Sequence, residues 1–247
     1  MTTALIVTHG QPSDPGPAEA ELAELAASVT DHLPGWHVGS ATLAGDGTLA
    51  ASLAAAGPSG LVYPLFMACG WFTRTHLPKR LAAAGAGPGW RMLRPFGCDA
   101  AVQALTVALA LEAANEAAGR TSVLLAAHGS GRSDAPSRIA QGVAARIEAA
   151  GFARAGAAFI DQSPQISTAT GHDAKSLCLP FFAARGGHVT DDLPAALAEA
   201  GFAGRLLPAV GLDARVPALI AAALMAGADR PCHGVICESE GRQTVWR

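Results

Sequence analysis

PLFMACGWFTRTHLPKRLAAAG, at Pro64–Gly85, returns 116 residues later as PFFAARGGHVTDDLPAALAEAG, at Pro180–Gly201. Ten of the 22 aligned positions are identical, which indicates an internal duplication. A second pair of segments, Val7–Gly10 and Ala126–Gly129, repeats at an offset of 119 and places a His-Gly step after the first apolar run of each half. The chain is therefore expected to contain two copies of one fold.

The two copies differ in their histidines. His128 and His188 both lie in the second half, whereas the first half has His9 but carries Phe72 where the second half has His188. A phenylalanine cannot bind a metal, and His76 is a poor substitute because it matches an acidic position four residues further on. The sequence predicts one complete two-histidine site, in the second half, and a degenerate first copy.

Length and composition restrict the class of protein. The 247 residues suit one large domain or two of about 120, and a content of 50% hydrophobic and 15% charged residues allows a substantial core. Net charge is −3 and no stretch is strongly basic, so we expect no nucleic-acid partner. No apolar run is long enough for a transmembrane helix, and the N-terminus has no basic signal-peptide region, so we expect no membrane association.

Cysteine usage and the duplication bear on compartment and assembly. Five cysteines form an odd, sparse set, which argues against a disulfide scaffold and favours a reducing cytoplasm. A duplicated chain already holds two copies of the fold, so a monomer is the expected state. Nothing in the sequence calls for a prosthetic group.

The elements alternate in a pattern typical of parallel α/β folds. Short apolar runs predict strands, and longer segments rich in Ala and Leu predict helices between them. We expect two tandem doubly wound parallel-sheet domains, residues 1–118 and 119–247, with a further edge strand at Gly234–Cys237. The predicted strands are 4–7, 37–43, 60–65, 91–94, 122–126, 156–160, 176–181 and 205–209, and the predicted helices are 18–33, 49–56, 77–83, 100–118, 137–149, 193–200 and 216–226.

Strand ends place the candidate site. His128 directly follows the first strand of its half, and His188 follows the third by a short Gly-rich loop. Ligands of such sheets bind at the carboxyl ends of the strands, so the two imidazoles should converge on one edge. Neutral imidazoles suit Co²⁺, Fe²⁺, Ni²⁺ or Zn²⁺. Two ligands are too few for a structural zinc site, which indicates transient metal binding with positions open to a substrate.

Other motifs carry weaker signals. Gly129–Arg132 resembles a phosphate-binding turn but lacks the Lys-Ser/Thr of a P-loop. Cys232 and Cys237, beside His233, have the wrong spacing for common zinc sites. A phosphoryl-transfer enzyme with a histidine nucleophile would need an arginine before the histidine, a place that Thr8 and Ala127 occupy.

The second half resembles a known family in two motifs. Leu124–Arg132, LLAAHGSGR, is similar to the first-strand signature of the class II tetrapyrrole chelatases, and Leu179–Pro194 is similar to their second signature. The likeness is greatest to the sirohydrochlorin cobaltochelatases and ferrochelatases of cobalamin and sirohaem biosynthesis. Ala158–Pro164 resembles the segment in which the family carries an acidic residue, here Asp161.

The resemblance implies a lyase-class enzyme that inserts Co²⁺ or Fe²⁺, as a substrate, into sirohydrochlorin. It places the metal ligands at His128 and His188, with Asp161 as a further catalytic group. Candidate groups for the substrate's carboxylates and macrocycle are Ser130, Arg132, Arg138, Arg185, His9, Trp71 and Phe72. The degenerate first half is expected to hold one face of the macrocycle, with Trp71 and Phe72 able to stack on it. A carrier that does not turn over, and a chelatase for another tetrapyrrole such as protoporphyrin, remain alternatives.

Overall fold

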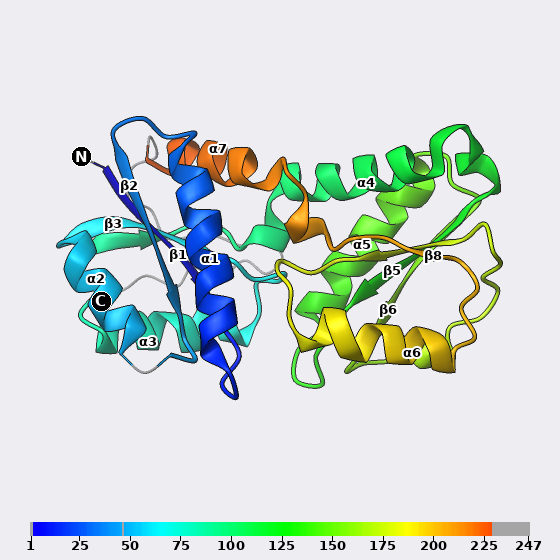
Figure 1. Ribbon diagram of the computed structural model, residues 1–247, viewed down its shortest axis with the longest axis horizontal. Helices are drawn as coiled ribbons and strands as arrows, with labels where there is room; N and C mark the ends of the chain where they lie inside the picture. The colour runs from blue at the N-terminus through cyan, green and yellow to red at the C-terminus, as the bar shows by residue number, and fades with distance from the viewer. Residues whose placement is uncertain (1, 46, 229–247) are drawn as a thin grey trace. The chain divides into compact units, whose positions relative to one another are not determined.

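Two units of similar architecture make up the computed structural model, which describes residues 2–45 and 47–228 (Figure 1). The first contains a four-stranded sheet in the order β2-β1-β3-β4, and all of its strands are parallel. Its strands are β1 (Thr2–Thr8), β2 (Trp36–Thr42), β3 (Ser59–Pro64) and β4 (Gly89–Met92), and its helices include α1 (Pro15–Thr30), α2 (Thr48–Ala56), α3 (Leu77–Ala83) and α7 (Val216–Ala228).

The second unit repeats this arrangement. Its sheet has the order β6-β5-β7-β8, again with all strands parallel. The strands are β5 (Ser122–Ala127), β6 (Arg154–Phe159), β7 (Leu177–Pro180) and β8 (Arg205–Leu206), and the helices are α4 (Ala100–Ala114), α5 (Ala135–Ala149) and α6 (Leu193–Glu199). The predicted fold class, two doubly wound parallel-sheet domains related by duplication, is confirmed.

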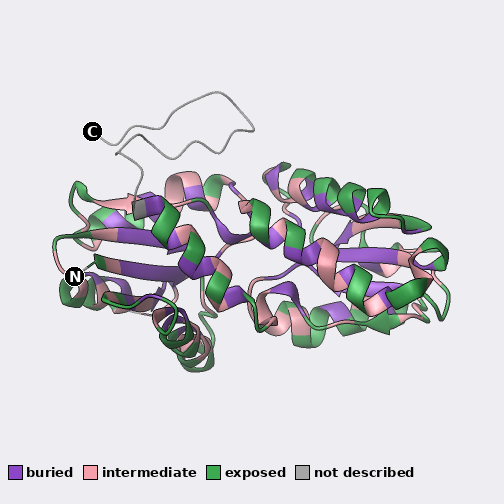
Figure 2. Ribbon diagram, turned by 90° about the horizontal axis from the view of Figure 1, so that it is seen from above, coloured by how far each residue is buried: buried purple, intermediate pink, exposed green. Residues whose placement is uncertain are grey.

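Both faces of each sheet are covered, which explains why the central strands are apolar throughout. In the first unit, Leu5 and Val7 of β1 pack with Leu49 of α2 and Leu77 of α3. The opposite face is covered by α1, which also packs against α7. In the second unit, α6 packs on the face that carries Leu124 and Ala126, and Figure 2 shows the strands buried and the outer sides of the helices exposed.

The compact units differ from the predicted boundary after residue 118. One unit holds the chain up to Cys98 and from Ala214 onward, and the other holds Asp99–Asp213. α4 packs against α5 and β7, and α7 packs against α1 and β3. The predicted boundary assigns α4 to the first sheet and α7 to the second, in each case the sheet that precedes the helix in sequence. In the structure the apolar side of each helix is instead buried in the other unit. The predicted strand at Gly234–Cys237 lies outside the described residues.

A π-helical turn precedes α3 and α6 at equivalent positions, Phe72–His76 and His188–Asp192. Pro78 and Pro194 follow one residue into each α-helix, where a proline cannot donate a backbone hydrogen bond and its ring obstructs the carbonyl four residues earlier. The turn widens instead, and the N–H of Leu193 donates to the carbonyl of His188. Sequence reasoning missed both turns, although a proline inside a continuing helix is a signal for them.

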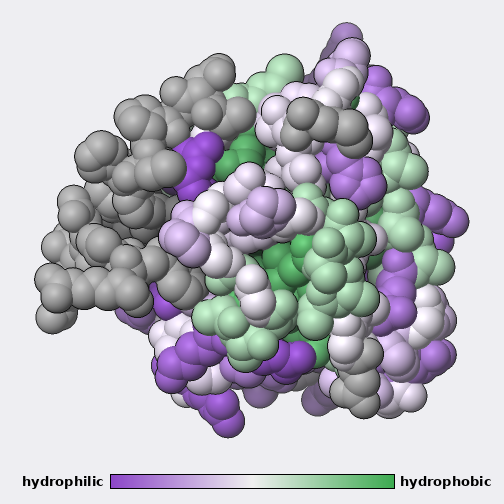
Figure 3. All heavy atoms as spheres, turned by 90° about the vertical axis from the view of Figure 1, so that its left-hand side faces the viewer, coloured by the Kyte–Doolittle hydropathy of each residue, from purple (hydrophilic) through white to green (hydrophobic). Residues whose placement is uncertain are grey.

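The surface is mixed. Figure 3 shows the end of the first unit, where apolar surface is bordered by hydrophilic side chains. Among residues 2–45 and 47–228, no helix is long and apolar enough to cross a membrane. No disulfide joins the cysteines of this part of the chain, Cys69, Cys98 and Cys178, and burial raises the pKa of the Cys178 thiol to about 12.

Candidate metal centre

The strand order reverses between β5 and β7, and this reversal positions the site. From β5 the chain passes to β6 on one side of the sheet and then returns past β5 to β7 on the other side. In parallel sheets, ligands bind outside the carboxyl ends of the strands at such a switch point. His128 directly follows β5, and His188 begins the π-helical turn after β7. The structure thus brings these two sequence-predicted histidines to the same edge of the same sheet.

The backbone after β5 is held in one conformation. Gly129 has φ +79, a value that L side chains rarely adopt, and a Cβ there would lie 2.7 Å from the Cβ of Gln162. The N–H of Asp161 donates to the carbonyl of His128 at 2.9 Å. The N–H of Ser130 donates to Gln162 Oε1 at 3.1 Å, and Gln162 Nε2 donates to the hydroxyl of Ser137 at 3.0 Å. The loop that carries His128 is therefore tied to the segment after β6 and, through Gln162, to α5.

The two imidazoles face one another through their Nε2 atoms, which lie 3.0 Å apart. Nδ1 of His128 lies 3.1 Å from the carbonyl oxygen of Gly129, and Nδ1 of His188 lies 2.7 Å from Oδ2 of Asp192. A carbonyl or carboxylate oxygen only accepts, so each Nδ1 is the donor, and when both rings are neutral each Nε2 has a lone pair close to that of the other. Lone pairs so close repel unless a cation lies between them, and the pair is thus arranged to accept a proton or a metal ion.

A carboxylate adjoins the pair. Asp161 Oδ2 lies 3.6 Å from Nε2 of His128, and the side chains of His128, His188 and Asp161 are 41%, 49% and 56% exposed. All three can therefore be reached from solvent. In the described part of the chain no group of three or more His, Cys, Asp or Glu side chains is arranged to hold a metal ion. The arrangement that the structure does contain is two facing imidazole nitrogens with a carboxylate nearby.

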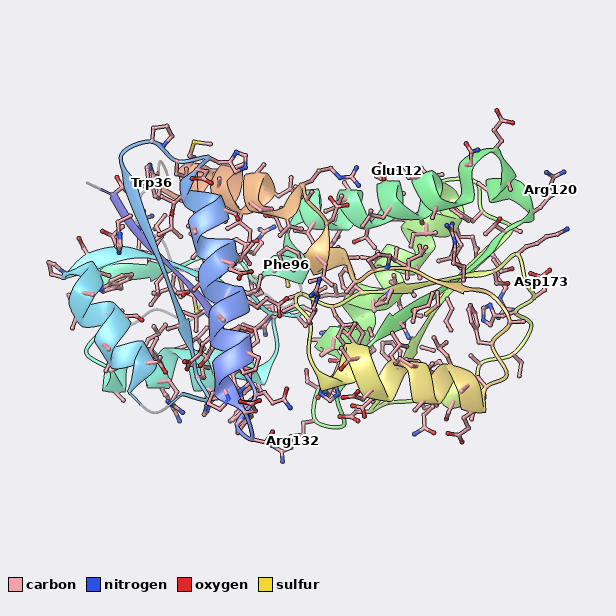
Figure 4. The ribbon with its side chains drawn as sticks, viewed as in Figure 1. Trp36, Phe96, Glu112, Arg120, Arg132 and Asp173 are labelled. Carbon is pink, nitrogen blue, oxygen red and sulfur yellow. The ribbon has the colours of Figure 1, made fainter. Side chains whose placement is uncertain are left out.

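The sequence-predicted groups for substrate carboxylates have different surroundings. Ser130 lies in the loop after β5, where its hydroxyl accepts from the N–H of Arg132 at 3.1 Å. The side chain of Arg132 is exposed at the tip of this loop (Figure 4). Arg138 forms an ion pair with Asp134 at 3.4 Å, so a ligand would have to compete for its guanidinium. Arg185 is exposed, three residues before His188.

The first unit repeats the geometry with aromatic rings. The centroids of His9 and Phe72 lie 4.9 Å apart, as against 4.2 Å for the two site histidines of the second unit. His76 contacts Phe72 at 4.7 Å and stacks on Trp71 at 5.4 Å. Burial, and secondarily Arg80, lowers the pKa of His76, which favours its neutral ring. Trp71 is 52% exposed, so this stack presents an open aromatic surface.

Two groups of the site were not predicted from sequence. Asp192 follows His188 by four residues, but their contact depends on the π-helical turn that joins them. Gln162 lies beside Asp161, yet its role depends on a hydrogen bond to Ser130, 32 residues away. A polar residue directly after Asp161, the predicted catalytic carboxylate, was the available signal for Gln162.

The comparisons with known proteins agree on one family. The CbiX family model matches residues 122–226. A solved structure of CbiX, the terminal enzyme for biosynthesis of siroheme in denitrifying bacteria, shares 49% identity over 91% of this chain and 98% of its own, with a TM-score of 0.83. Among curated proteins, none matches the chain.

More distant solved structures share the fold. SirB from Bacillus subtilis with Fe³⁺ is 17% identical, with a TM-score of 0.67 over 93% of this chain and 96% of its own. The sirohydrochlorin chelatase SirB from Bacillus subtilis subspecies spizizenii, in complex with cobalt, is also 17% identical, with a TM-score of 0.65 over 94% and 97%. Identity at this level supports the architecture alone.

A duplicated parallel-sheet fold in which one sheet ends in two facing imidazoles defines a chelatase-type α/β protein. Identity of 49% along nearly the whole of a relative then narrows the class. The chain belongs to the CbiX family.

Proposed function

We propose that this protein inserts a divalent metal into sirohydrochlorin, with Fe²⁺ as the metal in the cell and sirohaem as the product. One observation carries the proposal: two imidazoles lie at the carboxyl edge of a sheet with their Nε2 atoms 3.0 Å apart. The Nδ1 atom of each imidazole is hydrogen-bonded to an oxygen. The choice of iron rests on the 49% identical relative, which is the terminal enzyme of siroheme biosynthesis. Co²⁺ is the alternative metal, since imidazole ligands bind it at least as tightly as Fe²⁺.

The histidine pair holds the metal before transfer. A metal bound to His128 and His188 replaces the unfavourable contact between their lone pairs with two coordinate bonds. To bridge both nitrogens at ordinary bond lengths of about 2.0–2.1 Å, the rings need only a small adjustment from a separation of 3.0 Å. Two protein ligands leave most coordination positions open, so the ring nitrogens of the macrocycle can replace them one at a time.

Insertion releases two protons, because two pyrrole N–H groups lose hydrogen as the metal binds. Asp161 is the proposed acceptor of a proton, because it lies 3.6 Å from Nε2 of His128 and is 56% exposed, so it can pass the proton to solvent. The imidazoles themselves can accept protons once the metal has left them, since the lone pair of a neutral imidazole nitrogen is basic. In this proposal, metal delivery and proton removal occur at one edge of the sheet.

The substrate presents carboxylates and a flat macrocycle, and the chain offers groups for each. Ser130, Arg132, Arg138 and Arg185 are the proposed partners of the carboxylates, because all follow the strands that carry the histidines. The exposed rings of His9 and Trp71, with the partly buried ring of Phe72, are the proposed stacking surface. The stacking role fails if Phe72→Ala leaves substrate affinity unchanged while His9→Ala abolishes insertion.

The working state that we propose is a cytoplasmic monomer without a prosthetic group. The sparse cysteines and the internal duplication support these points. Sedimentation of the intact protein in the presence of metal tests the monomer.

The test is a spectral insertion assay under anaerobic conditions with sirohydrochlorin and Fe²⁺ or Co²⁺. We expect many turnovers by the wild type and a loss of turnover in both His128→Ala and His188→Ala. His32→Ala is a matched control, because His32 is exposed and lies in the first half of the chain, whereas both site histidines lie in the second half. A spectral change that stops at one equivalent of product would favour a carrier, and turnover indifferent to both histidines would refute the proposed site.

A further inference from the structure

A second candidate site lies in the same unit, at the end of the sheet away from the histidines. A cavity of about 500 Å³ opens where β5, β7 and β8 begin, and Leu177 and Arg205, the first residues of β7 and β8, line it. His128 follows the other end of β5, a strand of six residues that spans about 20 Å. The cavity is thus separate from the metal centre.

Cationic side chains dominate the cavity. Every ionisable residue that lines it is basic, namely Arg120, Lys175 and Arg205. The chain as a whole has a net charge of −3 and contains only two lysines, Lys79 and Lys175. One of the two lysines and two arginines therefore gather around a single cavity in an acidic protein, and we call this group the basic cavity.

The charges near the basic cavity are only partly offset. Asp173 adjoins it at the same end of the unit (Figure 4), and its carboxylate accepts from the N–H of Lys175 at 2.9 Å and from the hydroxyl of Ser176 at 3.1 Å. These hydrogen bonds lower the pKa of Asp173, so it is ionised and engaged within its own turn. No carboxylate is among the residues that line the cavity, so the lining itself is net positive.

The remaining wall suits an organic anion. Ala113, Ala114 and Ala117 supply methyl groups from the end of α4 and the turn after it. Nη2 of Arg205 donates to the carbonyl of Ala113 at 2.6 Å, which fixes the guanidinium and leaves its other N–H groups available. A volume of about 500 Å³ lies within the range of cavities that bind small molecules.

We propose that the basic cavity binds a small, multiply charged oxyanion, of the phosphoryl or polycarboxylate class. Arginine and lysine form charge-assisted hydrogen bonds to both groups, and three cations around one space favour an anion of charge two or more over chloride or acetate. This binding is independent of metal insertion and of the substrate proposed above.

Calorimetric titration of the intact protein with inorganic pyrophosphate and, separately, with citrate tests the proposal. We expect saturable binding of at least one of them, weakened about tenfold in Arg120→Gln and in Lys175→Gln. Binding of pyrophosphate alone assigns the phosphoryl class, citrate alone assigns the carboxylate class, and binding of both assigns recognition by charge. Arg205 is left unchanged because it also holds the end of α4.

Arg146→Gln is the matched control, since Arg146 is exposed in the same unit but does not line the cavity. It should bind the anion as the wild type does. Because Arg120 and Lys175 lie away from the metal centre, their variants should insert metal at the wild-type rate and melt at the wild-type temperature without anion. Absence of binding of both anions at millimolar concentration, or equal weakening by Arg146→Gln, would overturn the proposal.

Discussion

Replacing Asp192 should weaken metal binding without touching a metal ligand. Its Oδ2 accepts a hydrogen bond from Nδ1 of His188 at 2.7 Å, a length typical of a charge-assisted bond. That bond selects the tautomer with the lone pair on Nε2 and makes Nε2 a better donor to a metal. In the first unit the corresponding positions are Phe72 and His76, so the proposed ligand and its carboxylate partner are both absent there.

The magnitude follows from the bond and its exposure. Hydrogen bonds to charged groups contribute about 1.5–3 kcal/mol. The side chains of His188 and Asp192 are 49% and 51% exposed, so solvent screening favours the lower end of this range. We therefore expect Asp192→Ala to weaken Co²⁺ binding about tenfold, the lower part of the 10–100-fold range typical of such partners. Asp192→Asn should lose less, because an amide oxygen still accepts from Nδ1.

The assay is a Co²⁺ titration followed by visible absorption, with the insertion rate measured on the same samples. Asp191→Asn is the matched control, since it removes the same charge from the neighbouring exposed residue. Wild-type affinity in Asp192→Ala would refute the reasoning, as would equal weakening by Asp191→Asn. A fall in affinity in Asp192→Ala that Asp192→Asn largely recovers identifies a positioning residue, since a general loss of structure would not follow this order.

Three further predictions follow. Gly129→Ala should destabilise the protein by about 1–3 kcal/mol in urea unfolding, because φ is +79 and its Cβ would lie 2.7 Å from another side chain, whereas Gly131→Ala, with open space around it, should not. Burial, and then a nearby arginine, lowers the pKa of His172 below 6.5, so the unfolded chain takes up the proton first and stability should fall as pH drops below about 6.5. His172→Gln should remove that part of the pH dependence in urea unfolding, and an unchanged profile would contradict it. Phe72→His should add a second, weaker Co²⁺ equivalent beside His9, and a stoichiometry that stays at one would show that the two copies are not equivalent in geometry.

Local pattern was sufficient for most of the fold. Strands predicted at 4–7 and 122–126 are present at Thr2–Thr8 and Ser122–Ala127, and the predicted helix at 77–83 matches α3. These elements were readable because a parallel strand covered on both faces must be apolar along its length, and because a covering helix must be apolar on one side. The π-helical turns were not predicted, because a single widened turn does not visibly change the hydrophobic periodicity of a helix.

Part of the candidate site was likewise predictable from the sequence, and part was not. His128 and His188 were predicted to converge because each follows a strand of one parallel sheet, and their Nε2 atoms lie 3.0 Å apart. Their orientation was not predictable, since it depends on where the Gly129 carbonyl and the Asp192 carboxylate lie.

The sequence by itself determined the duplication, the parallel α/β class and the half that keeps both histidines. These properties follow from the hydrophobic periodicity of the chain and from the residues at the ends of its strands, both of which are features of local sequence. Only the tertiary structure decided that α4 and α7 join the sheets they do, that Asp192 orients His188, and that Arg120, Lys175 and Arg205 surround one cavity. These features depend on which apolar surface a helix buries, or on contacts that a particular backbone turn creates. Neither kind of contact can be predicted from the sequence of a single strand or helix.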